Sequence, residues 1–245
     1  MPPLLTRFKP ALRKLPGYRI ARFLRGLAGN TESRNAALLL LRPPKGLYQP
    51  YGTTSVDRYP ELFRLVGDLL RANPSPRILS FGCATGEEVF TLRRCFPTAA
   101  LLGIDINPFN IAVCRLRRLR SGDKNMLFAT AASAAGQPAA SYDAIFAMAV
   151  FRHGDLNIAP PPPSCGHRIR FADFDRSIAD LARVLKPGGL LVVHHAMFRV
   201  CDTGAASHFA PVLCLKRDPA APLYGSDDRL LTAVDDPAVI LRKLG

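Results

Sequence analysis

The sequence of 245 residues lacks a long apolar run, and almost all acidic residues are missing from its first 45 positions. Its longest apolar candidate, residues 36–41, stops at Arg42-Pro43-Pro44 and is far too short to span a membrane. No long apolar segment follows the basic start, so we also expect no signal peptide. These absences favour a cytoplasmic chain without a transmembrane segment, which could still bind a membrane surface from one side.

Paired cysteines are absent as well. The six cysteines include no CxxC pair and no zinc-ligand spacing, and they occur at Cys83, Cys95, Cys114, Cys165, Cys201 and Cys214. Cys165-Gly166-His167 is too isolated to form a metal site. We therefore expect no metal, and we expect the cysteines to be small buried hydrophobic residues of a reduced compartment.

The most informative stretch is residues 77–92, which reads RILSFGCATGEEVFTL. Its apolar start, residues 78–81, is long enough for a buried parallel strand. A turn of small residues, 82–86, follows it, and Val89, Leu92 and Phe96 then recur at helical spacing. Such a turn bends the chain without steric penalty and lets backbone N–H groups approach a ligand closely.

The acids after this turn indicate which ligand it suits. A dinucleotide fingerprint places a third glycine where Glu87 stands, and two carboxylates at Glu87 and Glu88 would repel a pyrophosphate. The turn therefore disfavours an NAD enzyme and suits a neutral or cationic ligand, such as the sulfonium and ammonium groups of S-adenosylmethionine.

The letters GCATGEE resemble motif I of class I S-adenosylmethionine-dependent methyltransferases, in the variant seen in chemotaxis-receptor methyltransferases. The resemblance covers roughly residues 50–195. It includes Asp105, nineteen residues beyond Gly86, the apolar run 142–148, and the phrase LARVLKPGGLLVV. It implies an α/β fold with a doubly wound, mostly parallel, seven-stranded Rossmann-like sheet and helices on both faces. It also implies methyl transfer from S-adenosylmethionine to an unknown oxygen or nitrogen acceptor. A cofactor-binding regulatory or scaffold protein without catalysis is the alternative.

Asp105 follows an apolar run at residues 100–104, and one carboxylate can accept hydrogen bonds from both ribose hydroxyls. The resemblance further implies that Thr54 and Arg58 meet the methionine carboxylate. After the weak strand 126–129 the usual acid for adenine is missing, so Ser133 or the backbone would replace it. The cofactor contacts expected in this way are Arg58, Gly82, Cys83, Ala84, Thr85, Gly86, Glu87, Asp105, Ile106, Asn107, Ser133 and Ala147.

Histidines after the strands offer candidates for a base. His153 falls one turn beyond the strand at 142–148 and is either a general base or a plain loop histidine. His194 and His195 end the strand at 190–194, and strand alternation predicts that they point to opposite faces. Residues 160–163, all proline, predict a stiff insertion that forms part of an acceptor lid.

The remaining segments complete the predicted sheet. A helix over 173–185 should stop at Lys186-Pro187-Gly188-Gly189, and residues 212–216 and 238–243 should form a closing antiparallel hairpin.

Residues 1–45 carry ten Lys and Arg against the single acid Glu32, a net charge of +9 out of +14. Apolar residues at helical spacing predict two short basic amphipathic helices, over 5–15 and 20–27. We expect residues 1–45 to be a basic helical extension and residues 46–245 to be the methyltransferase domain. The extension is a structural cap, a mitochondrial presequence, or a contact with an anionic partner such as nucleic acid, a membrane surface or an acidic protein.

Overall fold

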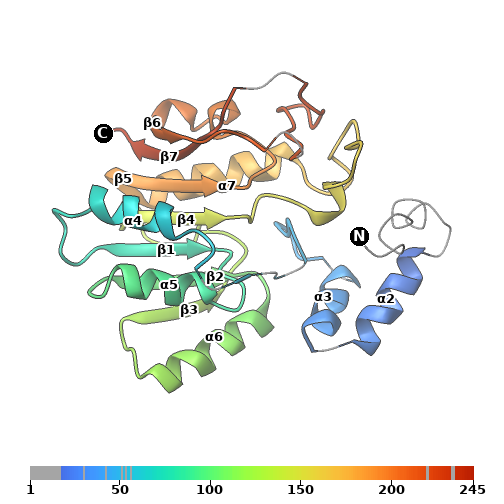
Figure 1. Cartoon of the computed structure of the whole chain (residues 1–245), viewed down its shortest axis with the longest axis horizontal. Helices are drawn as coiled ribbons and strands as arrows, with labels where there is room; N and C mark the ends of the chain where they lie inside the picture. Colours follow the sequence, from blue (N-terminus) through green and yellow to red (C-terminus); the bar gives the residue numbers. More distant parts are fainter. Residues whose placement is uncertain are drawn as a thin grey trace, which may run out of the picture.

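The computed structural model describes residues 18–29, 31–41, 43–50, 52, 54–55, 57–218, 221–232 and 235–245. A seven-stranded sheet runs through it in the order β3-β2-β1-β4-β5-β7-β6 (Figure 1). The strands are β1 (Arg77–Phe81), β2 (Ala100–Asp105), β3 (Met126–Thr130), β4 (Tyr142–Met148), β5 (Leu185–His194), β6 (Phe209–Cys214) and β7 (Ala238–Lys243). β1 to β5 are parallel, and β7 is antiparallel to both of its neighbours. This confirms the predicted doubly wound, mostly parallel sheet of seven strands.

Helices cover both faces of the sheet, as predicted. The helices that flank the sheet are α4 (Pro60–Leu69), α5 (Glu87–Cys95), α6 (Pro108–Ser121) and α7 (Phe171–Val184), and α2 (Tyr18–Ala28) and α3 (Thr31–Leu41) precede them. Successive strand residues point to opposite faces, which creates two apolar cores. Ile78 and Phe146 lie in the core that α4, α5 and α6 cover, whereas Leu79 and Ile145 lie in the core that α7 covers.

Local sequence explains where the helices next to the site begin. Pro60 opens α4, where its missing N–H costs nothing. The Asn107 side chain caps α6 by accepting a hydrogen bond of 3.0 Å from the Phe109 amide. Gly86 begins α5 with a φ of 93°, a left-handed conformation that glycine adopts without strain. The turns after β1 and β2 are thereby held in place.

The second half of the sheet corrects two predicted boundaries. α7 ends at Val184, one residue before the predicted end, but β5 begins at Leu185, five residues before the predicted strand, and includes Lys186-Pro187-Gly188-Gly189. Tyr142 pairs with Leu185 and Ala144 with Leu190, so a bulge absorbs the extra residues. β6 begins at Phe209, three residues before the predicted strand, and tolerates Pro211 because it is the edge strand. β7 has the predicted bounds.

The N-terminal helices α2 and α3 pack on each other beside the carboxyl ends of the strands (Figure 1). They approach closely, because a Cβ atom at Gly26 would lie 3.0 Å from the Cβ of Ala37. The helix predicted over 20–27 is confirmed as part of α2, the one predicted over 5–15 lies outside the described residues, and α3 was not predicted. We refer to α2 and α3 together as the helical hairpin.

Two further findings concern the whole chain. Within the described residues, no helix is long and apolar enough to cross a bilayer. Cys83, Cys114 and Cys165 are buried, but Cys95, Cys201 and Cys214 are exposed, so the prediction of buried cysteines was wrong for half of them.

Candidate cofactor and active site

A cavity opens beyond the carboxyl ends of β1, β2 and β4, where the order of the strands reverses. Ligands of open α/β sheets bind at this kind of switch point. The cavity wall includes Gly82, Cys83 and Ala84 after β1, Asp105, Ile106 and Asn107 after β2, Ala131 and Ala132 after β3, and Met148, Ala149 and Val150 after β4. Most of these side chains are small, which leaves room for a ligand against the strand ends.

Asp105 lines the cavity with a carboxylate that accepts three hydrogen bonds, and it is only 8% exposed. Its Oδ1 accepts hydrogen bonds from the Asn107 amide at 2.8 Å and from Asn110 Nδ2 at 3.1 Å, and its Oδ2 accepts one from the Ala84 amide at 2.9 Å. Burial raises the pKa of Asp105, and these three donors oppose that effect. A carboxylate offers about four acceptor positions, so Oδ2 keeps one for a ribose hydroxyl.

The glycines of the first turn are required by the protein's own packing. Gly82 and Gly86 have φ values of 75° and 93°. A Cβ atom at Gly82 would lie 2.4 Å from Cγ2 of Val150, and one at Gly86 would lie 3.0 Å from Sγ of Cys114. Only glycine fits both the left-handed backbone and these neighbours.

Backbone strain also gathers at this end of the sheet. Ala84, Ala149 and His195 have φ values of 47°, 58° and 52°, and each follows the end of a different parallel strand, β1, β4 and β5. A left-handed residue with a side chain costs roughly 1–2 kcal/mol. Such strain typically clusters where a backbone is shaped around a ligand.

The two acids after the turn have different surroundings. Glu87 does not line the cavity: its Oε1 forms an ion pair of 2.7 Å with Arg117, and its Oε2 accepts a hydrogen bond from the Thr85 hydroxyl. Glu88 does line the cavity, and its Oε1 accepts a hydrogen bond of 2.7 Å from the Ser80 hydroxyl. Burial raises the pKa of Glu88 to about 7, against the opposing effects of Ser80 and the charge of Arg58. The structure therefore moves the cavity acid from the predicted Glu87 to Glu88.

The other predicted contacts divide in the same way. Arg58, Gly82, Cys83, Ala84, Asp105, Ile106 and Asn107 line the cavity, whereas Thr85, Gly86, Glu87, Ser133 and Ala147 do not. Ser133 instead accepts a hydrogen bond from the Ala135 amide within its turn, and Ala132 faces the cavity. Ala147 is fully buried in the sheet core, one residue before Met148, which reaches the wall.

Arg58, Tyr59 and Thr54, which precede α4 in the chain, also line the cavity. The guanidinium carbon of Arg58 lies 5.3 Å from the centre of the Tyr59 ring. The Tyr59 hydroxyl is buried and has no hydrogen-bond partner among the described residues. A buried unpaired hydroxyl costs about 1–3 kcal/mol unless a ligand satisfies it.

The histidines lie elsewhere than expected. His153 is buried at 6% exposure, does not line the cavity, and accepts a hydrogen bond of 3.2 Å from the Asp155 amide at the start of the 3-10 helix Gly154–Leu156. His194 and His195 do not point to opposite faces, because β5 ends at His194 and the left-handed backbone of His195 turns its ring back. Their ring centres are 3.9 Å apart, and both rings contact Tyr59.

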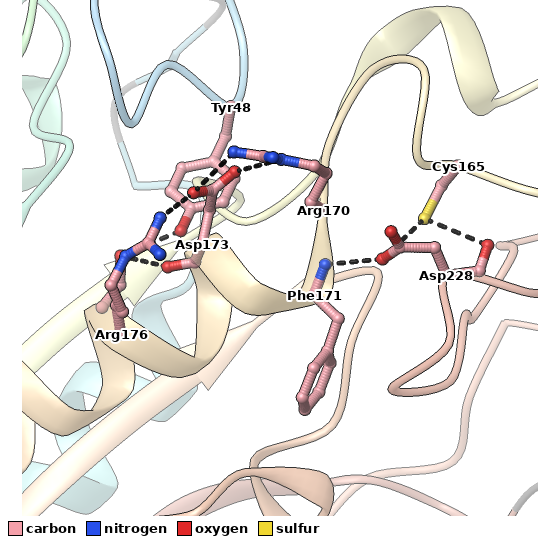
Figure 2. Close-up of polar contacts among 8 residues, drawn as sticks. Tyr48, Cys165, Arg170, Phe171, Asp173, Arg176 and Asp228 are labelled. Carbon is pink, nitrogen blue, oxygen red and sulfur yellow. Dashed lines mark hydrogen bonds and ion pairs between the residues drawn. The ribbon is translucent and has the colours of Figure 1, made fainter.

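The proline-containing insertion is tied to the start of α7 and to the C-terminal segment (Figure 2). Asp228 accepts a hydrogen bond of 2.6 Å from the Phe171 amide, while its backbone oxygen accepts one from the Cys165 amide. The Tyr48 hydroxyl, which belongs to a cavity-lining residue, lies 2.9 Å from Oγ of Ser177 on α7. The insertion and one wall of the cavity are therefore anchored to the same helix.

Comparison with known proteins agrees with this geometry. Residues 79–191 match the family model described as "Methyltransferase domain". The chain is 29% identical over 126 residues to a demethylmenaquinone methyltransferase of Thermus thermophilus, a match covering 51% of this chain and 50% of that protein. It is 32% identical over 117 residues to a ubiquinone biosynthesis O-methyltransferase of Chelativorans sp., covering 48% of this chain and 39% of that protein. The chain thus spans half or less of the length of these relatives.

A solved structure of PKMT2 from Rickettsia typhi in complex with AdoHcy has a TM-score of 0.40 and 19% identity, over 55% of this chain and 24% of that chain. The strand order, rather than this superposition, defines the fold. Sheet order, cavity position and the family match agree with one another. Residues 79–191 resemble a methyltransferase domain, as the sequence motifs predict.

Proposed function

We propose that this chain transfers the methyl group of S-adenosylmethionine to an oxygen or nitrogen atom of an acceptor. The observation that carries the proposal is the buried carboxylate of Asp105, which faces the cavity at the switch point with an acceptor position to spare. An oxygen acceptor is supported by the likeness to a ubiquinone biosynthesis O-methyltransferase.

The cavity residues fit the parts of the cofactor. Asp105 would accept from the ribose, and Arg58 would meet the methionine carboxylate. Glu88, ionised, would pair with the methionine ammonium, because its carboxyl group faces the cavity and an incoming cation offsets the cost of its burial. The backbone around Ala132 would meet the adenine.

Bound cofactor would supply an electrophilic methyl group, which the acceptor attacks in line. The protein's own contribution is then to hold both molecules in register and to exclude water, which explains why no catalytic triad is needed. We do not assign His153 the role of base in this proposal, because its ring caps a turn away from the cavity.

The test of this proposal is Asp105→Asn with Asp123→Asn as the matched control. The asparagine keeps one acceptor oxygen but loses the charge, so we expect affinity for S-adenosylhomocysteine to fall by about 1.5–3 kcal/mol, or tenfold or more. Asp123 pairs with Arg93 away from the cavity, so its variant should bind normally. Calorimetry is the suitable measurement, since the chain has no tryptophan.

Equal binding by the folded Asp105→Asn variant would reject the ribose assignment. Cofactor binding without methylation of any component of a cell extract, followed with labelled methyl groups, would instead favour a regulatory or scaffold protein.

We further propose that the helical hairpin contacts an anionic membrane surface. Ile20 and Leu24 on α2 are 66% and 57% exposed, and Leu38 on α3 is 50% exposed. Exposed apolar residues beside arginines are typical of helices that lie in a lipid interface. Leu39 of α3 lines the cavity, so a membrane-bound hairpin would bring the cavity close to the lipid surface.

A further inference from the structure

A cluster of basic and aromatic side chains surrounds Tyr59 at one edge of the cavity. It consists of Arg58 and Tyr59 before α4, Arg152 after β4, and His194 and His195 at the end of β5, and we call it the rim cluster. Tyr59 belongs both to the cavity wall and to this cluster. The cluster therefore borders the cofactor cavity beyond the ends of β4 and β5.

Arg152 brings a half-buried positive charge to the rim cluster. Within the described part of the chain, its guanidinium has no acidic partner in an ion pair. Burial and the nearby charge of Arg58 both lower the pKa of Arg152. A partly desolvated cation beside a like charge is costly unless an anion joins it.

The histidines of the cluster add aromatic surface rather than charge. Burial, the neighbouring His195 and Arg58 lower the pKa of His194 to about 4, so its ring is neutral at pH 7. Partial burial and the charges of Arg152 and Arg58 lower the pKa of His195 as well. The Tyr59 ring lies 5.4 Å and 5.6 Å from the two imidazole centres. Two imidazole rings therefore contact the ring of Tyr59, whose buried hydroxyl has no hydrogen-bond partner among the described residues.

Two acids interact with members of the cluster electrostatically. Asp218 is exposed and acts on His195, and Glu88 is directed to Ser80 in the cavity. A ligand that brought a negative group to Arg152 and a hydrogen-bonding group to Tyr59 would relieve both unmet costs. A planar ligand would also stack on the rings.

We propose that the rim cluster is the acceptor subsite and that it selects a planar, anionic acceptor, whose carboxylate or phosphate group is bound by Arg152 and whose ring packs against Tyr59 and His195. This inference rests on the proposed methyl transfer, because it places the acceptor next to the cofactor cavity. It assigns the substrate class that the family likeness leaves open.

Binding of model compounds to the protein saturated with S-adenosylhomocysteine tests the subsite. The probes are benzoate, phenyl phosphate and the neutral isostere benzamide, measured by ligand-observed NMR titration at pH 7.5. We expect benzoate or phenyl phosphate to bind at least tenfold more tightly than benzamide. Preference for one of the two anions would show whether the acceptor carries a carboxylate or a phosphate.

Variants of Arg152 test whether this residue binds the anionic group of the probes. Arg152→Gln should weaken anion binding at least tenfold and leave benzamide unchanged, whereas Arg120→Gln, an exposed control on α6 with the same change in charge, should stay within twofold of the native protein. Arg152→Lys should retain part of the preference, because it keeps the charge but loses the planar fork. If Arg152→Gln fails to fold, Arg152→Lys and the preference of the native protein for anions over benzamide still test the proposed subsite.

The outcomes separate this inference from the proposed function. A native protein that fails to bind S-adenosylhomocysteine would contradict the cofactor assignment itself. Normal binding of S-adenosylhomocysteine without preference for anions over benzamide, or with equal anion binding by a folded Arg152→Gln variant, would overturn the acceptor subsite alone.

Discussion

At the scale of single residues, Glu88 lines the cavity, where its burial destabilises the folded protein but positions its carboxyl group to bind a ligand. Glu88 sits where burial raises its pKa from the ordinary 4.5 to about 7, although Ser80 donates a hydrogen bond to it. The folded protein therefore holds more protons than the unfolded chain between these two values, and its stability falls as the pH rises through that window.

Glu88→Gln should remove this pH dependence. We expect the variant without cofactor to be more stable than the native protein by about 1–3 kcal/mol at pH 8, with the difference shrinking toward pH 4.5. Urea denaturation at both pH values measures it. Parallel stability curves for the two proteins would contradict the assignment of a raised pKa.

Glu88→Gln should also weaken binding of the cofactor. A glutamine cannot pair with the methionine ammonium, so we expect affinity for S-adenosylhomocysteine to fall tenfold or more at pH 8. Native affinity should rise with pH up to about 7, as the Glu88 carboxyl group ionises, and then level off. If Glu88→Gln is less stable than the native protein at pH 8 and binds S-adenosylhomocysteine equally well, both expectations are wrong.

The choice between two adjacent acids shows the limit of residue-level prediction. Neighbouring helix positions point about 100° apart, so only one of Glu87 and Glu88 can face the cavity. Comparison with the third glycine of a dinucleotide motif pointed to Glu87, but Arg117, thirty residues later, pairs with it. Ser80, a buried polar residue in an apolar strand, was the available signal for Glu88, because buried hydroxyls need partners.

At the scale of elements, the turn after β1 depends on one close contact with the turn after β4. Gly82→Ala places a methyl group 2.4 Å from Cγ2 of Val150 and keeps a left-handed φ of 75°. We expect a loss of about 2–4 kcal/mol in stability, from the backbone penalty and overpacking together. Thermal and chemical denaturation would measure this loss.

Two further variants separate these causes. Gly122→Ala has a similar φ of 69° with nothing within 4 Å of the new Cβ, so it should cost only about 1 kcal/mol. Val150→Ala combined with Gly82→Ala should recover about 1–2 kcal/mol by removing the methyl groups that clash. If the double variant is no more stable than Gly82→Ala, backbone strain rather than packing explains the requirement for glycine.

Sequence patterns located β1, β2, β4 and β7 well, because these are apolar runs between clear turns. They failed where tertiary pairing overrides local signals. Lys186-Pro187-Gly188-Gly189 follows the end of α7 as predicted, yet pairing of β5 with β4 on both sides of it makes it a bulge within β5 rather than a loop before the strand. The opposite-face prediction for His194 and His195 assumed that the strand continues, and the positive φ of His195 ends it.

At the scale of the whole molecule, the extension should be separable from the cofactor site. A chain starting at Lys45 keeps all cavity-lining residues except Leu39, and it keeps Tyr48, which contacts α7. We expect it to bind S-adenosylhomocysteine like the full chain, in a calorimetric titration. Loss of folding in the shortened chain would show that the extension is a structural cap.

The shortened chain should lose binding to anionic vesicles. Residues 1–45 carry a net charge of +9 and residues 46–245 only +5, so full-length binding should weaken steeply with salt. Ile20→Ser with Leu24→Ser is the control that keeps charge but removes exposed apolar contact, and it should weaken vesicle binding severalfold. If the full chain binds generic RNA but not vesicles, the anionic partner is nucleic acid rather than a membrane. If it binds neither, the proposal of an anionic partner surface is rejected.

The position of β4 beside β1 has a consequence for synthesis of the chain. A ribosome makes β1, β2 and β3 in succession, and we expect β2 to pair with β1 and β3 to pair with β2 as they emerge. The second edge of β1 waits for β4, which begins 61 residues after the end of β1, at Tyr142. Until then the nascent chain presents an apolar strand with open backbone groups. We therefore expect the strand edge at the switch point, beside the cavity, to need protection from other chains during translation.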